Sequence, residues 1–164
     1  MSTEIVRFKH ILLAEDDPQD AELAMTALND LNLAKNVTVV SDGAEALDYL
    51  YHRGKYTARA GGNPALVMLD NKMPKVSGLE VLQIIKTDAH LQAIPVVALT
   101  SSREPSDLAE FYRHGVNAYV VKPVGFPEFM KAVKLLGDFW GKVNEVPPHT
   151  EMISVQKSTT QVSG

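Results

Sequence analysis

The fold is decided by a stretch near the amino terminus, Ile11-Leu12-Leu13-Ala14-Glu15-Asp16-Asp17-Pro18. Four apolar residues are followed directly by three acids, so a short buried strand is predicted to run into a polar edge. Asp17 and Pro18 then indicate a helix start, with the aspartate as N-cap and the proline in the first helical position. A strand that leads at once into a helix is typical of proteins that alternate the two elements.

The same alternation continues along the chain. Further apolar runs follow at residues 37–40, 66–69, 94–99 and 118–121. Amphipathic stretches predict helices at about 18–31, 43–51, from 78 onward, 106–115 and 126–140. Nearly continuous apolar strands are typical of sheets that are buried on both faces. The sequence therefore predicts an α/β fold, a doubly wound five-stranded parallel sheet with helices on both faces.

Composition excludes several classes of protein. The 164 residues fit one domain, and a formal net charge of −4 argues against a surface for nucleic acid. The chain has no cysteine, which excludes disulfides, thiol catalysis and cysteine zinc sites. No apolar run approaches the roughly 20 residues that span a bilayer, and residues 1–9 do not resemble a signal peptide. We therefore expect a cytoplasmic protein that contacts neither nucleic acid nor membrane.

The residues that follow the predicted strands carry the chemistry. Glu15 and Asp16 follow the first strand, Asp70 the third, Thr100 the fourth and Lys122 the fifth. In open α/β sheets, ligands bind beyond the carboxyl ends of the strands, so these side chains are expected to converge. Crowded carboxylates stay ionised only with a cation among them, and hard oxygen ligands without histidine suit Mg²⁺. A carboxylate can also serve as the nucleophile in phosphoryl transfer.

These motifs resemble the receiver domain of two-component response regulators over residues 8–141. The match rests on residues 11–18, on Val67-Met68-Leu69-Asp70 with Met73-Pro74 and Gly78, on Pro95-Val96-Val97-Ala98-Leu99-Thr100, and on Gly115 through Tyr119-Val120-Val121-Lys122-Pro123. The resemblance implies the flavodoxin-like strand order 2-1-3-4-5. It also implies that the chain is a signalling switch and not an enzyme with a turnover substrate.

The resemblance assigns a role to each matching residue. Asp70 accepts a phosphoryl group from a histidine kinase, and Glu15, Asp16, Asp70 and the backbone carbonyl of Lys72 hold Mg²⁺. Thr100 and Lys122 bind the phosphoryl group, and Tyr119 is the aromatic that reports the switch. Lys122-Pro123 matches the position of a cis peptide bond in the family. Lys72 departs from the polar uncharged residue that often stands there, so the lifetime of the phosphorylated state stays open.

Two features narrow the family further. A long loop at residues 52–64 and the ending Phe139-Trp140 look like regulators paired with phytochrome-type kinases, so such a kinase is an expected partner. Residues 142–164 are polar, and we expect a tail that is disordered or contacts a partner. No output domain is expected after the receiver domain.

The last two predicted helices carry more apolar residues than one buried face needs. An apolar band that is wider than one face suggests a second burial surface, and the family commonly dimerises through this region. We therefore expect a homodimer. Its interface residues would be Leu108, Phe111, Tyr112, Leu135 and Phe139.

Three other functions are alternatives to this interpretation of the sequence. A Mg²⁺-dependent phosphohydrolase would also use an aspartyl nucleophile, but the first strand is not followed by the Asp-x-Asp motif that such haloacid-dehalogenase-like enzymes share. A receiver-like interaction module that is never phosphorylated stays open, because an intact pocket demonstrates competence and not use. A dinucleotide-binding fold is disfavoured, since acids replace the Gly-rich turn after the first strand.

Overall fold

The computed structural model describes residues 2–159. Its main body is a five-stranded parallel sheet formed by β2 (Ile11–Ala14), β3 (Val37–Val40), β4 (Leu66–Leu69), β5 (Val96–Thr100) and β6 (Ala118–Val121). The strands lie in the order β3-β2-β4-β5-β6. When only these five strands are numbered along the chain, this is the predicted order 2-1-3-4-5. The predicted fold class is therefore confirmed.

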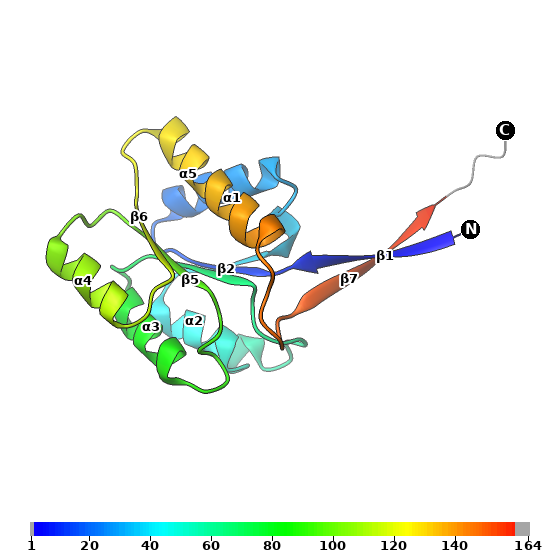
Figure 1. Cartoon of the computed structure of the whole chain (residues 1–164), viewed down its shortest axis with the longest axis horizontal. Helices are drawn as coiled ribbons and strands as arrows, with labels where there is room; N and C mark the ends of the chain where they lie inside the picture. Colours follow the sequence, from blue (N-terminus) through cyan, green and yellow to red (C-terminus); the bar gives the residue numbers. More distant parts are fainter. Residues whose placement is uncertain (1, 160–164) are drawn as a thin grey trace.

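Helices cover both faces of the sheet (Figure 1). Helices α1 (Pro18–Asp30) and α5 (Phe126–Asp138) pack on one face, and α2 (Gly43–Leu50), α3 (Gly78–Thr87) and α4 (Pro105–Arg113) pack on the other. Alternate strand residues supply the two cores: Leu12 and Ala14 join the cluster under α2, α3 and α4, while Ile11 and Leu13 join the cluster under α1 and α5. This alternation follows from the two-residue period of a strand.

Aspartates cap the first two helices, and the predicted N-cap Asp17 is confirmed. The Asp17 carboxylate accepts hydrogen bonds from the backbone N–H groups of Gln19 and Asp20, at 2.8 and 3.2 Å. The Asp42 carboxylate accepts one from the N–H of Glu45 at 2.7 Å, which starts α2 in the same way. These caps accept hydrogen bonds from backbone N–H groups of the first turn, which have no acceptor within the helix. They also fix where each helix begins relative to the strand before it.

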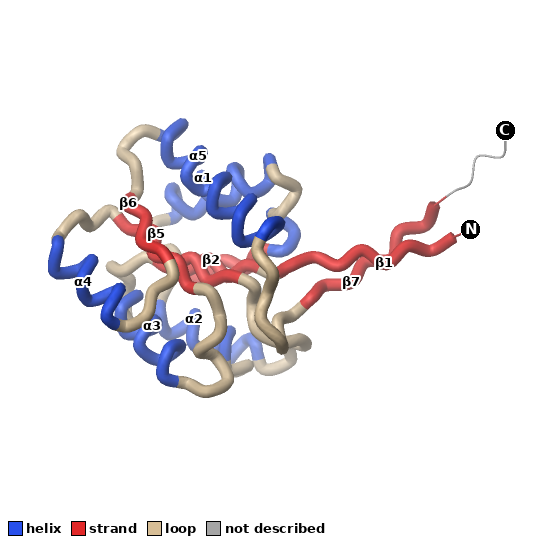
Figure 2. The backbone as a smooth tube through the Cα atoms, in the orientation of Figure 1, coloured by secondary structure: helices blue, strands red, loops and turns tan. Residues whose placement is uncertain are grey.

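A second, two-stranded sheet projects from the body. Strand β1 (Ser2–Lys9) pairs antiparallel with β7 (Met152–Thr159) along its whole length, from Ser2 opposite Thr159 to Lys9 opposite Met152. Figure 2 shows this ribbon running out beyond the helices of the body. The sequence predicts a tail over residues 142–164 that is disordered or contacts a partner. Residues 152–159 form a strand instead of a disordered tail, because their pairing strand lies at the opposite end of the chain, and contact with a partner stays a prediction.

A π-helical turn over Phe139–Val143 joins α5 to the segment that leads into β7. Short 3₁₀ turns at Ala34–Asn36 and Gly54–Tyr56 complete the elements. Within residues 2–159, no helix is both long and apolar enough to cross a bilayer.

Candidate functional site

The carboxyl ends of the parallel strands bring the predicted acids together. Glu15 follows β2 and Asp70 follows β4, and both side chains are buried. Asp16 lies beside them and is exposed. One carboxylate oxygen from each of the three residues lies within 4.8 Å of the others. Such a group of hard oxygen donors fits a divalent cation of the Mg²⁺ or Mn²⁺ type.

Lys122 is the cation at the centre of this site. Its Nζ lies 2.7 Å from Glu15 Oε2, 2.9 Å from Asp20 Oδ2 and 3.4 Å from Asp70 Oδ2. Only 10% of the lysine side chain is exposed. Lys122 follows β6, so the sheet topology delivers its ammonium group to carboxylates that follow β2 and β4.

Asp20 also belongs to the site, although it was not predicted from the sequence. This residue lies in the first turn of α1, three residues after the N-cap, rather than at the end of a strand. Because α1 starts at the carboxyl edge of the sheet, an acid in its first turn faces the same site. The signal was available, since a helix that follows a functional strand end presents its first turn to the ligand.

Burial and charge oppose one another in this cluster. Burial raises the pKa of Glu15 to about 7 although the Lys122 ammonium beside it acts in the opposite direction, and the nearby Asp70 carboxylate raises it further. Burial alone would lower the pKa of Lys122, but its hydrogen bonds to Glu15 and Asp20 raise that pKa above the ordinary value. The lysine therefore stays charged, and the acids around it gain from any further positive charge.

The backbone after Asp70 is held in a tight turn. The N–H of Asn71 donates to Asp70 Oδ1 at 2.8 Å, and the carbonyl of Asn71 accepts from the N–H of Gly78 at 2.9 Å. A Cβ atom on Gly78 would lie 2.0 Å from the backbone oxygen of Asp70, so only glycine fits there. Lys72 lies inside this turn, and its carbonyl as a metal ligand stays a prediction.

Thr100, the last residue of β5, and Tyr119 in β6 both contact Ser102, which follows β5. Thr100 is buried, and its hydroxyl oxygen accepts from the N–H of Ser102 at 3.3 Å. The Tyr119 hydroxyl donates to the carbonyl of Ser102 at 3.1 Å, and its ring packs edge-on against Phe111 at 5.5 Å. The two predicted switch residues are thus linked through one loop. Their roles in switching stay predictions.

Two expectations need correction. Phe111 was predicted at a dimer interface, but it is 0% exposed and packs in the core, so it presents nothing to a second subunit. The Lys122–Pro123 bond is trans, as are the other peptide bonds of the described residues. Trans is the lower-energy form of an X–Pro bond when nothing enforces the alternative. The other proposed interface residues are exposed: Leu108 (41%), Tyr112 (54%), Leu135 (62%) and Phe139 (48%).

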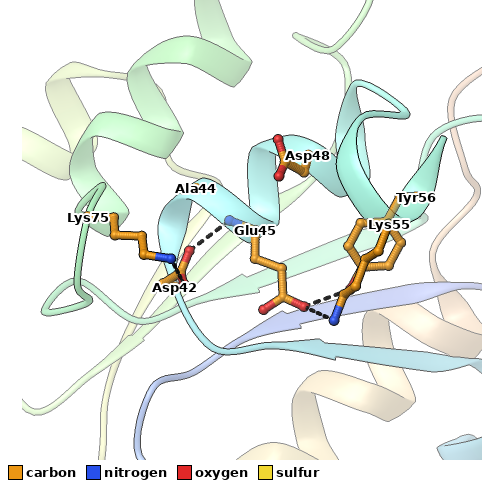
Figure 3. A pocket seen from close by; sticks show the side chains of 7 residues that line it. All are labelled: Asp42, Ala44, Glu45, Asp48, Lys55, Tyr56 and Lys75. Atoms are coloured by element: carbon orange, nitrogen blue, oxygen red, sulfur yellow. Dashed lines mark hydrogen bonds and ion pairs between the residues drawn. The ribbon is translucent and has the colours of Figure 1, made fainter.

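Two surface hollows of the described residues can be compared with the acidic site. One of about 180 Å³ borders the acidic site and includes Asp20, Lys122 and the exposed Phe126 in its lining. A larger one of about 330 Å³ lies over α2 and the loop after it (Figure 3). Figure 3 shows that charges in the larger hollow pair internally: Lys75 with Asp42, and Lys55 with Glu45. Only the smaller hollow adjoins the predicted chemistry.

Comparison with known proteins agrees with this geometry. The model of the response regulator receiver domain matches residues 11–134. Response regulator Rcp1 of Synechocystis is 33% identical, with 90% of this chain and 99% of Rcp1 covered. The solved structure of its Mn²⁺-bound form has a TM-score of 0.77 at 32% identity, covering 85% of this chain and 99% of that one.

Two other solved structures are similar. The phosphorylated cyanobacterial phytochrome response regulator RcpA is 36% identical with a TM-score of 0.80, over 85% of this chain and 99% of RcpA. The bacteriophytochrome response regulator AtBRR is 57% identical with a TM-score of 0.67, over 84% of this chain and 99% of AtBRR. Phytochrome-associated response regulators are thus among the homologues of this protein. With its sheet order and the receiver-domain match, the chain belongs to the response regulator receiver domain family of two-component signalling.

Proposed function

We propose that the protein accepts a phosphoryl group on Asp70 from a sensor histidine kinase of the phytochrome type, in a reaction that needs Mg²⁺. The observation that carries this proposal is the contact of Lys122 with Glu15, Asp20 and Asp70 in a buried acidic cluster. The similarity to a phosphorylated phytochrome response regulator supports the same chemistry. In the transfer, the P–N bond of the phosphohistidine breaks and a P–O bond to Asp70 forms.

The residues of this chain fit a metal by the chemistry of their donors. Glu15, Asp16 and Asp70 would hold the cation, and the raised pKa of Glu15 reflects a buried carboxylate that a cation would stabilise. When bound, Mg²⁺ neutralises negative charge on the transferred group. The homologue Rcp1 has a Mn²⁺-bound form, which supports a divalent cation at this position.

Lys122 and Thr100 would act on the phosphoryl oxygens. The Lys122 ammonium is a fixed positive charge in a mostly buried setting, where it stabilises new negative charge more strongly than in water. The Thr100 hydroxyl oxygen accepts from the N–H of Ser102, and the O–H of the same group would donate to a phosphoryl oxygen. Tyr119 donates to the carbonyl of Ser102, so any movement of Thr100 toward the phosphoryl group would reach Tyr119 through Ser102.

Metal dependence is the first test. Incubation with acetyl phosphate and Mg²⁺ is expected to add one phosphate to the intact mass, and EDTA is expected to abolish the addition. Continuous release of phosphate over many turnovers would instead favour a phosphohydrolase. Absence of any addition at all Mg²⁺ concentrations would favour an interaction module that is not phosphorylated.

Asp20 gives a second test of the same site. Its carboxylate competes with a phosphoryl oxygen for Lys122, so Asp20→Asn is expected to lengthen the lifetime of phosphorylated Asp70. The loss of one partly exposed ion pair corresponds to about 0.5–1 kcal/mol, or about two- to fivefold in lifetime. The control is Glu22→Gln, an exposed acid on the same helix. An unchanged or shorter lifetime in Asp20→Asn would contradict this role.

The output of the switch is expected to pass through protein contacts, including those of a homodimer. Leu108 and Tyr112 on α4 and Leu135 and Phe139 near α5 are exposed on the two helices that flank the edge strand β6. The β1–β7 ribbon supports the same proposal, because an isolated two-stranded sheet is marginally stable in water and gains from a second copy.

The dimer is tested by sedimentation velocity at tens of micromolar protein, with and without a phosphoryl mimic. A dimer is expected in at least one state, and Leu135→Ala is expected to weaken it. A monomer in both states would contradict the proposal.

A further inference from the structure

The loop at residues 52–64 is longer than a connection from a helix to a strand needs, and the phosphoryl site does not use it. It precedes β4, so it lies at the amino edge of the sheet, opposite to the edge that holds Asp70. The segment that leads into β7 lies against this loop. Asn63 and Thr150 form a parallel β-bridge between the two.

Arg59 is the centre of the contact between loop and segment. Its guanidinium lies 4.1 Å from the centre of the Tyr49 ring, and its Nε donates to the Tyr49 carbonyl at 3.1 Å. Its Nη1 donates to the Gly62 carbonyl at 3.1 Å and to Glu151 Oε2 at 3.4 Å. The arginine side chain is 10% exposed, unlike a surface arginine that makes one loose ion pair.

The remaining arm of the guanidinium is bound by His52. Arg59 Nη2 lies 2.9 Å from His52 Nε2, and His52 Nδ1 lies 2.9 Å from the Arg59 carbonyl. An arginine can only donate, so Nε2 accepts and the proton of the neutral imidazole lies on Nδ1. His52 therefore holds Arg59 through both its guanidinium and its backbone carbonyl. These contacts within the loop orient the arginine toward Glu151.

The backbones of loop and segment also fit closely. The N–H of Asn63 donates to the His149 carbonyl at 3.0 Å, and the N–H of Glu151 donates to the Asn63 carbonyl at 2.7 Å. A Cβ atom on Gly62 would lie 2.3 Å from the His149 oxygen. The glycine thus permits an approach that any larger residue would block.

We propose that loop 52–64 is a docking surface for the chain's own segment 147–151, and that this docking fixes the direction in which the β1–β7 ribbon leaves the receiver body. Strand β7 begins at Met152, directly after Glu151. Lys9, at the other root of the ribbon, donates through Nζ to the Asn144 carbonyl. Both strands are therefore anchored where they leave the body. The long loop serves this anchoring and takes no part in the phosphoryl site.

Hydrogen exchange on the full chain tests the docking. The amides of Asn63 and Glu151 are expected to be protected, and Arg59→Ala and Gly62→Ala are each expected to raise their exchange rates at least tenfold. The first variant removes the anchor, and the second forces the backbones apart. The control is Arg53→Ala in the same loop, whose exposed side chain pairs with Asp48 and lies over the Tyr51 ring, away from segment 147–151. Its exchange is expected to match that of the parent protein.

The direction of the ribbon is tested by a pair of spin labels, which is simple to place because the chain has no cysteine. With labels at position 131 on α5 and position 157 on β7, one narrow distance distribution is expected. Arg59→Ala is expected to broaden it at least twofold. A broad distribution in the parent protein, or unchanged exchange in both loop variants, would overturn the proposal.

These outcomes are independent of the proposed phosphorylation. Phosphate uptake on Asp70 is expected to be the same in Arg59→Ala and the parent protein, because the loop and Asp70 lie at opposite edges of the sheet. If circular dichroism shows that Arg59→Ala is unfolded, its loss of phosphate uptake reports misfolding, and the docking is then tested with Gly62→Ala alone. If Gly62→Ala is folded and its Asn63 and Glu151 amides are still protected, the proposed docking surface is wrong.

Discussion

Replacing Asp70 by asparagine is expected to abolish phosphate uptake from acetyl phosphate while the protein stays folded. Asparagine has nearly the same shape but is a far weaker nucleophile than a carboxylate, so the P–O bond cannot form there. The measurement is the intact mass after incubation with Mg²⁺, with Asp48→Asn as a control in an exposed carboxylate of the same charge. Uptake that persists in Asp70→Asn would place the acceptor elsewhere.

The same substitution carries an expectation for stability. Asp70 is buried beside Glu15, and its charge raises the pKa of that residue. Removing one of the carboxylates relieves repulsion, while Lys122 keeps Glu15 and Asp20 as partners at 2.7 and 2.9 Å. We therefore expect the Tm of the metal-free Asp70→Asn variant to be equal to or higher than that of the parent protein. A large fall in Tm would indicate that Asp70 is chiefly a structural ion-pair partner.

The second large effect is expected at Phe111. Its ring is 0% exposed, belongs to the core under α2, α3 and α4, and packs edge-on against Tyr119. Replacing it by alanine removes buried apolar area and leaves a cavity, which costs about 3–5 kcal/mol of the free energy of unfolding. Urea denaturation at matched protein concentration gives this value.

The matched control for Phe111 is Tyr112→Ala, one position along the same helix and 54% exposed. Exposed substitutions usually change stability by no more than about 0.5 kcal/mol. If the two variants lost equal stability, the burial of Phe111 would be contradicted.

Sequence patterns predicted the sheet well because each strand is a short apolar run that stops at a polar residue. Glu15, Asp70, Thr100 and Lys122 could be assigned to one edge of the sheet without coordinates, since parallel strands bring their carboxyl ends together. Asp20 was not predicted because it lies in the first turn of α1 and not at the end of a strand.

The remaining differences have physical causes. Helix α4 is short, so the spacing of Leu108, Phe111 and Tyr112 did not reveal which of them points inward. Strands β1 and β7 lie at opposite ends of the chain, and a pairing over such a separation leaves no local pattern. Arg59 lies in a loop whose length is visible in the sequence, but its partner Glu151 follows 92 residues later. Local sequence therefore predicted the body and its chemistry better than the attachment of the ends.

The most direct test of the central claim is to locate the phosphate itself. The parent protein would be phosphorylated by acetyl phosphate with Mg²⁺ and then treated with borohydride, which reduces an aspartyl phosphate to an alcohol. Peptide mass spectrometry would then identify the changed residue. We predict a single change, at Asp70. A change at Asp16 or Asp20, or a phosphate that resists reduction and lies on a serine or threonine, would contradict the account.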